Sequence, residues 1–95
     1  MQPTLALGQI VVTANAATML QEARQEAAEF LSRHAQGDWG DISAYEKEAF
    51  DQGFAEGSRV IFLSAYPLRT GQTIWVVTNL HQGTTTVLLP HEQAR

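Results

Sequence analysis

The chain has 95 residues, 44% of them hydrophobic and 17% charged, with a formal net charge of −4. This length suits one domain with a thin core, and the composition is too apolar for a disordered chain. The sequence contains no cysteine, which excludes disulfides, thiol nucleophiles and cysteine-based zinc sites.

The N-terminal residues carry no basic segment followed by an apolar run, so no signal peptide is predicted. No apolar run approaches the ~20 residues of a membrane span. A cysteine-free chain also suits a reducing compartment. We therefore expect a cytoplasmic protein without membrane contact.

The charge is unevenly distributed along the chain. Residues 15–57 hold nine acidic side chains against three basic ones, whereas the remaining residues hold one acidic and three basic. A negative surface repels phosphate and attracts a basic partner, so direct nucleic-acid binding is not expected. The same pattern is also typical of a solvated helix surface, and composition does not separate the two interpretations.

The first third of the chain predicts a strand and then helix. Residues 5–13 include a β-branched apolar run typical of a strand. Asn15 suits the N-cap of a helix whose apolar residues recur every three or four positions as far as His34. The apolar stripe is thin near Arg24, so one helix and two helices with a kink there both fit the pattern. Gly37 is a suitable end for this helical region.

The loop Gly37–Asp41 and the preceding His34 contain the residues most suited to bind a metal ion or a partner. His34 is predicted either as a partly buried histidine bonded to the following loop or, with Asp38 and Asp41, as one ligand of a metal site. Trp39 either fills the gap between helices and sheet or stands exposed as an anchor for a partner.

A further helix is predicted over residues 44–55. Ser43 and Glu46 match a capping box, and Gly57 is a natural stop. Tyr45 is expected to face inward with the phenylalanines of this helix.

Three strands follow, over residues 59–66, 72–80 and 84–89, joined by turn-sized connections that favour antiparallel neighbours. We therefore predict a single α+β domain over residues 1–95, with a small antiparallel β-sheet of about four strands and two or three helices packed on one face. The predicted core residues are Leu20, Phe30, Leu31, Phe50, Phe54, Ile61, Leu63 and Val76. The opposite sheet face would be solvated, covered by a partner, or paired in a homodimer.

No motif for catalysis or cofactor binding is present: there is no nucleophile elbow, phosphate loop or dinucleotide fingerprint. Two alternatives remain open. One is a metal-dependent hydrolase or nuclease that uses His34, Asp38 and Asp41. The other is a DNA-binding accessory protein that uses Arg59, Arg69 and Trp75.

Several segments, in this order, resemble a family of small bacterial proteins found on plasmids, phages and other mobile elements. The segments are Leu7–Val11, His34–Gly40 with its HxxGDWG motif, Leu63–Tyr66, Ile74–Thr78 and Thr85–Pro90 with its TTVLLP strand. Members are often labelled plasmid-related protein or type I restriction endonuclease subunit M. A methyltransferase subunit needs a much longer cofactor-binding domain, so the second label does not fit this chain. Members commonly place an acidic turn after the Ile-Trp-Val-Val-Thr strand, and this chain has Asn79–Gly83 there instead.

The leading hypothesis is a small acidic, non-enzymatic accessory protein of a mobile genetic element, without cofactor or metal. Its partner would be a host or plasmid-encoded protein, for instance a nucleic-acid-binding one with a basic surface. One concrete form is an inhibitor of a host defence system, anti-CRISPR or anti-restriction. The residues predicted to contact the partner are His34, Asp38, Trp39, Asp41, Glu46, Glu48 and Asp51.

Overall fold

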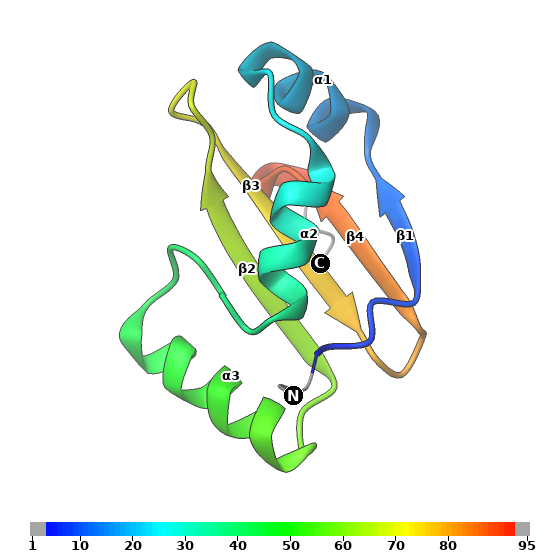
Figure 1. Ribbon diagram of the computed structural model, residues 1–95, viewed down its shortest axis with the longest axis vertical. Helices are drawn as coiled ribbons and strands as arrows, with labels where there is room; N and C mark the ends of the chain where they lie inside the picture. Colours follow the sequence, from blue (N-terminus) through cyan, green and yellow to red (C-terminus); the bar gives the residue numbers. More distant parts are fainter. Residues whose placement is uncertain (1–3, 93–95) are drawn as a thin grey trace.

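The structure of the protein, a computed structural model, describes residues 4–92. Within these residues three α-helices and a four-stranded sheet form the predicted α+β fold (Figure 1). No helix in this part of the chain is both long and apolar enough to cross a membrane. In chain order the elements are β1 (Gln9–Val12), α1 (Ala14–Ala23), α2 (Ala27–Ala35), α3 (Ala44–Glu56), β2 (Ile61–Pro67), β3 (Thr73–Asn79), β4 (Thr84–Leu88) and the 3₁₀ helix η1 (Pro90–Glu92).

The first helical region is broken in two, as one of the two predicted alternatives required. Arg24 adopts a left-handed conformation at φ 56° and ends α1, and α2 starts after Glu26. The start of α1 differs from the prediction. Thr13, not Asn15, is the N-cap, because its hydroxyl accepts a hydrogen bond from the backbone N–H of Ala16 at 3.1 Å.

The predicted ends of α3 are confirmed. Ser43 and Glu46 form the capping box, each side chain bonding the other residue's backbone N–H, and Gly57 ends the helix at φ 67°. Local sequence signals were sufficient here, because these contacts lie within four residues of each other.

The sheet has the strand order β1-β4-β3-β2. The three C-terminal strands are antiparallel neighbours, as their short connections predicted. β1 instead lies parallel to β4, with Val11 opposite Thr86, so the sheet is mixed at this edge. All three helices lie between β1 and β2 in the chain, and such a long connection allows β1 to run parallel to its neighbour.

The helices cover one face of the sheet and leave the other open (Figure 1). Phe62, Ser64 and Tyr66 of β2 face the helices and are at most 1% exposed. The prediction that Ile61 belongs to the core is therefore wrong, since it lies on the open face and is 42% exposed. Leu63 is only partly buried. Strand residues alternate between faces, so one wrong assignment inverted the whole strand.

The core consists of two apolar clusters on the covered face. The larger lies under α1 and α2 and contains Leu20, Phe30, Tyr66, Ile74, Val76 and Val87 among its buried members. The smaller lies under α3 and is built from Leu5, Trp39, Phe50 and Phe62. Leu20, Phe30, Phe50 and Val76 were correctly predicted as core, and Leu31 and Phe54 pack partly buried against it.

Candidate functional site

The loop that follows α2 runs alongside β2 and pairs with this edge of the sheet at Ala65. Gly40 and Ala65 form a parallel bridge. The backbone N–H of Ala65 donates to the carbonyl of Trp39 at 3.1 Å, and that of Asp41 donates to the carbonyl of Ala65 at 2.6 Å. The predicted turn is thus a short mimic of a fifth strand, held by the backbone.

Trp39 holds this loop against the core. Its side chain is 3% exposed and stacks on Phe62, with ring centroids 5.3 Å apart. The indole Nε1–H donates to the carboxylate of Asp51 on α3 at 2.8 Å. Of the two predicted roles, Trp39 therefore fills the gap between helices and sheet and is not an exposed anchor.

His34 lies completely buried on α2, next to the Trp39 ring. Its Nδ1 is 2.6 Å from the Ser64 hydroxyl, and its Nε2 is 2.9 Å from the Thr78 hydroxyl. The prediction of a structural histidine bonded to the following loop was wrong in its partner, since the imidazole bonds two strands of the sheet.

A chain of hydroxyl groups continues from His34 across the sheet. Thr78 and Thr85 hydroxyl oxygens lie 2.7 Å apart, and Thr85 donates to the backbone carbonyl of Leu7 at 2.6 Å. A carbonyl only accepts, so Thr85 must use its proton there and accept from Thr78. Thr78 must in turn accept from His34, which places the imidazole proton on Nε2. Ser64 then donates to Nδ1.

Every polar atom in this buried chain is therefore satisfied by a neutral imidazole. Within residues 4–92 no buried side-chain nitrogen or oxygen lacks a hydrogen-bond partner. Burial lowers the pKa of His34 to about 4 from its ordinary value of 6.5, because the charged form loses its hydration. The arrangement holds α2 onto β2, β3 and β4 at neutral pH.

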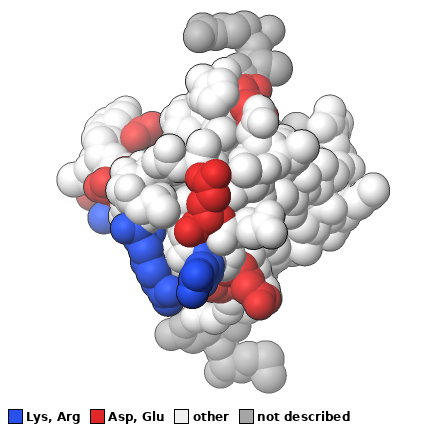
Figure 2. All heavy atoms as spheres, turned by 90° about the horizontal axis from the view of Figure 1, so that it is seen from above, with Lys and Arg blue, Asp and Glu red and all other residues white. Residues whose placement is uncertain are grey.

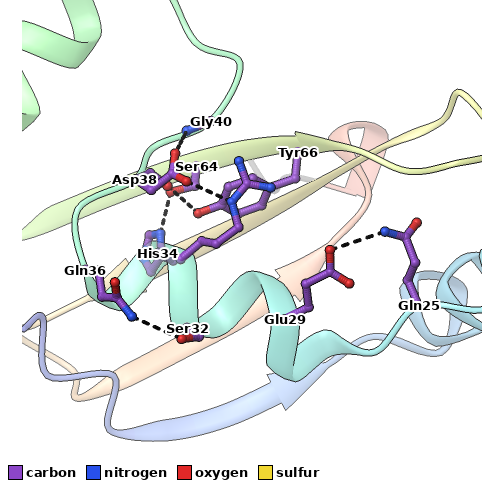
Figure 3. Close-up of polar contacts among 10 residues, drawn as sticks. Gln25, Glu29, Ser32, His34, Gln36, Asp38, Gly40, Ser64 and Tyr66 are labelled. Carbon is purple, nitrogen blue, oxygen red and sulfur yellow. Dashed lines mark hydrogen bonds and ion pairs between the residues drawn. The ribbon is translucent and has the colours of Figure 1, made fainter.

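Asp38 is positioned by three contacts at the surface (Figure 3). Its carboxylate accepts from Arg33 Nε at 2.8 Å and from the backbone N–H of Gly40 at 3.2 Å. Its carbonyl accepts from the Tyr66 hydroxyl. The guanidinium of Arg33 also lies over the Tyr66 ring, 4.5 Å from its centroid. The Arg33 hydrogen bond holds the pKa of Asp38 below its ordinary value.

The remaining predicted contact residues lie around this anchored loop. Asp41, Glu46, Glu48 and Asp51 are exposed, although Glu46 also serves the capping box and Asp51 accepts from Trp39. Tyr45, expected to face inward, is instead 83% exposed. It lies in the first turn of α3, one residue before Glu46 and three residues before Glu48.

The structure does not bring together the residues of the two alternative functions. Among residues 4–92 no group of three or more His, Asp or Glu side chains could hold a metal ion, and both His34 nitrogens are occupied by hydroxyls. Arg59 precedes β2 and Arg69 follows it, so the two arginines lie at opposite ends of a seven-residue strand. Trp75 lies half-buried on β3.

Sequence reasoning missed most of the groups that hold the site. Thr78 and Thr85 were not recognised as buried partners, although both interrupt apolar alternation in strands. The ion pair of Arg33 with Asp38, beyond the end of α2, was not predicted either. A polar residue on a strand face otherwise filled with apolar side chains was the available signal.

Comparison of this chain with protein-family models, with curated proteins and with solved structures found no match.

Proposed function

We propose that the chain is a small non-enzymatic binding protein of a mobile genetic element that contacts a basic protein through an acidic surface. We call this the acidic surface and define it by Asp38, Asp41, Tyr45, Glu46, Glu48 and Asp51. An inhibitor of a host defence system, anti-CRISPR or anti-restriction, is the concrete form. The link to mobile elements rests on the sequence resemblance alone.

The observation that carries the proposal is that buried side chains and backbone hydrogen bonds hold the loop that bears Asp38 and Asp41. Trp39 and His34 are buried, and both the backbone N–H and the carbonyl of Ala65 are hydrogen-bonded to the loop. A surface held in one conformation loses little conformational entropy when it binds, so more of its contact energy appears as affinity. His34 and Trp39 thus contribute by positioning, and a partner that docks on this surface meets the carboxylates around them.

Tyr45 supplies the feature that a purely solvated acidic helix would lack. Exposed tyrosines are enriched at the energetic centres of interfaces because they bury a large ring with little loss of side-chain freedom. Tyr45 sits between Asp41 and Glu48 in the sequence and is 83% exposed. An exposed aromatic ring with acidic residues close to it in the sequence matches a basic groove, such as one that holds nucleic acid.

The experiment is capture of partners from a host lysate with the tagged chain at low and high salt. The test variant is Asp41→Asn, Tyr45→Ala and Glu48→Gln combined, because none of these side chains holds the fold. The control is Glu22→Gln with Glu26→Gln, which removes two exposed charges elsewhere. We expect a basic protein to be captured by the wild type and the control, and lost with the test variant or at high salt.

Two results would contradict the proposal. One is recovery of the chain alone at low salt. The other is capture of the same protein by the test variant and the control in equal amounts, which would place binding on another surface.

A further inference from the structure

The edge of the sheet formed by β1 is open and apolar, and the Glu92 carboxylate that bonds Thr13 and Asn15 lies just beyond its C-terminal end. Ile10, Val11 and Val12 are 46%, 44% and 37% exposed, so neither face of this strand is covered. β1 lies at the right-hand edge of the sheet in Figure 1, and no described element lies beyond it. An exposed apolar edge strand is a template for pairing with another strand.

The hydrogen-bonding groups of β1 show which residues face outward. The backbone N–H groups of Gln9 and Thr13 donate to carbonyls on the β4 side, of Gly83 at 2.9 Å and Val87 at 3.0 Å. In a parallel ladder, alternate residues bond the same neighbour, so Val11 also faces β4. Ile10 and Val12 therefore direct their N–H and C=O groups to the outer edge.

We propose that β1 pairs with β1 of a second copy of this chain, antiparallel across a two-fold axis at Val11. In this register Ile10 lies opposite Val12 of the second copy, and each such pair exchanges two backbone hydrogen bonds. Val11 lies opposite Val11 of the second copy in the non-hydrogen-bonded position. Two four-stranded sheets would then form one continuous sheet.

Two observations favour a second copy over a foreign strand. The strand is self-complementary, because the antiparallel register places only β-branched apolar side chains opposite each other. The first 21 residues also contain no charged side chain. Two copies with net charge −4 repel each other, and the residues of β1 itself, Gln9–Val12, add no like charges at the contact.

Figure 2 agrees with this placement. Viewed from above, blue and red side chains gather on the left and centre, and the right-hand side is uncharged. Figures 1 and 2 share the horizontal axis, so the uncharged side is the side of β1. The inference is independent of the acidic surface and goes beyond the proposed function.

The first test is molecular mass by analytical ultracentrifugation over a range of concentrations. A four-residue strand forms a small interface, so we expect a dimer that dissociates on dilution. Val11→Glu and Val11→Lys should each be monomeric, because the two-fold axis places identical charges directly opposite each other. A mixture of the two variants should recover dimers. Val60→Glu is the control, since Val60 is 45% exposed and precedes β2 at the other edge.

The second test is disulfide cross-linking through one introduced cysteine, since the sequence contains no natural cysteine that could react instead. Non-hydrogen-bonded antiparallel pairs bring Cα atoms to about 4.5 Å, within the range a disulfide spans. Val11→Cys should therefore oxidise to a covalent dimer much faster than Val60→Cys. Circular dichroism of each variant verifies that it is folded.

Several results would overturn the inference. A wild type that remains monomeric at every concentration, with Val11→Cys cross-linking no faster than Val60→Cys, removes the dimer. Dimers that persist in both Val11 charge variants place the interface elsewhere. A monomeric chain whose capture of a partner is lost with Val11→Glu would assign the edge to a foreign strand.

Discussion

The two edge strands of the sheet, β2 and β1, differ in what lies beside their outer hydrogen-bonding groups. At the β2 edge the loop after α2 occupies the outer hydrogen-bonding groups of Ala65, and Trp39 fixes the loop from below. At the β1 edge Ile10 and Val12 face outward with no described segment beside them. An edge can be protected by tertiary contacts or left available for pairing. The difference is that a loop pairs with the middle of β2, whereas no described segment pairs with the outer side of β1.

The hydrogen-bonded chain of buried polar side chains also distinguishes the two edges. It begins at Ser64 on β2, passes through His34, Thr78 and Thr85, and stops at the carbonyl of Leu7 before β1 starts. The closed edge thus shares a hydrogen-bonded network with the helices, whereas β1 is held by its ladder with β4. We expect substitutions to be far more costly on the closed side.

The largest effect is expected for Trp39→Ala. Loss of a buried indole and of the contacts beneath the loop should lower the free energy of unfolding by about 4 kcal/mol. Val11→Ala at the open edge should cost less than about 1 kcal/mol in the dilute monomer, because the side chain is nearly half exposed. Urea denaturation of both variants measures the two values. Equal losses would mean that the edges are not different in stability.

Gly40→Ala should cost about 3 kcal/mol, because an added Cβ would lie 2.1 Å from the Ala65 carbonyl oxygen and φ is +75°. Gly57→Ala is a matched control, with φ +67° and no atom within 4 Å of the added carbon. The control should cost only the backbone strain, about 1 kcal/mol. Thermal denaturation compares them. A difference near zero would show that the loop moves away from β2 without penalty.

Acid should weaken the closed side through His34. Its folded pKa of about 4 lies below the ordinary value of 6.5, so the unfolded chain binds the proton more readily. The contribution of neutral His34 to the free energy of unfolding is therefore fully present above pH 6.5. It falls as the pH decreases toward 4, by at most about 3 kcal/mol. Unfolding followed from pH 7 to pH 4 tests this.

The control for this pH dependence is His34→Gln, which retains a donor toward Thr78 but does not titrate. This variant should be less stable at pH 7 and should lose the decrease between pH 6.5 and 4.5. Asp38 and Glu92, whose pKa values are lowered, contribute only at lower pH. A wild type and variant with parallel pH curves would exclude His34 as the cause.

On the β2 side the smallest effect is expected for Asp51→Ala, which removes the acceptor of the Trp39 indole N–H. The loss should be about 1 kcal/mol, typical of one partly exposed hydrogen bond. Asp51→Asn keeps an oxygen at the acceptor position, so it should retain most of the stability while removing a charge. Equal stability of all three chains would show that α3 does not hold the loop through this contact.

The candidate site was predictable in its location but not in its roles. The concentration of His34, Asp38, Trp39 and Asp41 around two glycines correctly marked a structured loop. Which of these side chains point inward depends on β2, more than twenty residues away in the sequence. Tyr45 illustrates the same difficulty, since its place in α3 suited an inward position and the structure leaves it exposed.

The sequence by itself determined the main helices and strands of this protein and the ends of α3. The capping box at Ser43, the stop at Gly57 and the short connections between the last strands depend on neighbours in the chain. Only the tertiary structure decided that Ser64 rather than Ile61 faces the helices, and that β1 runs parallel to β4. The physical reason is that a strand's two faces are distinguished by what packs on them, and here a buried imidazole needed two hydroxyl partners.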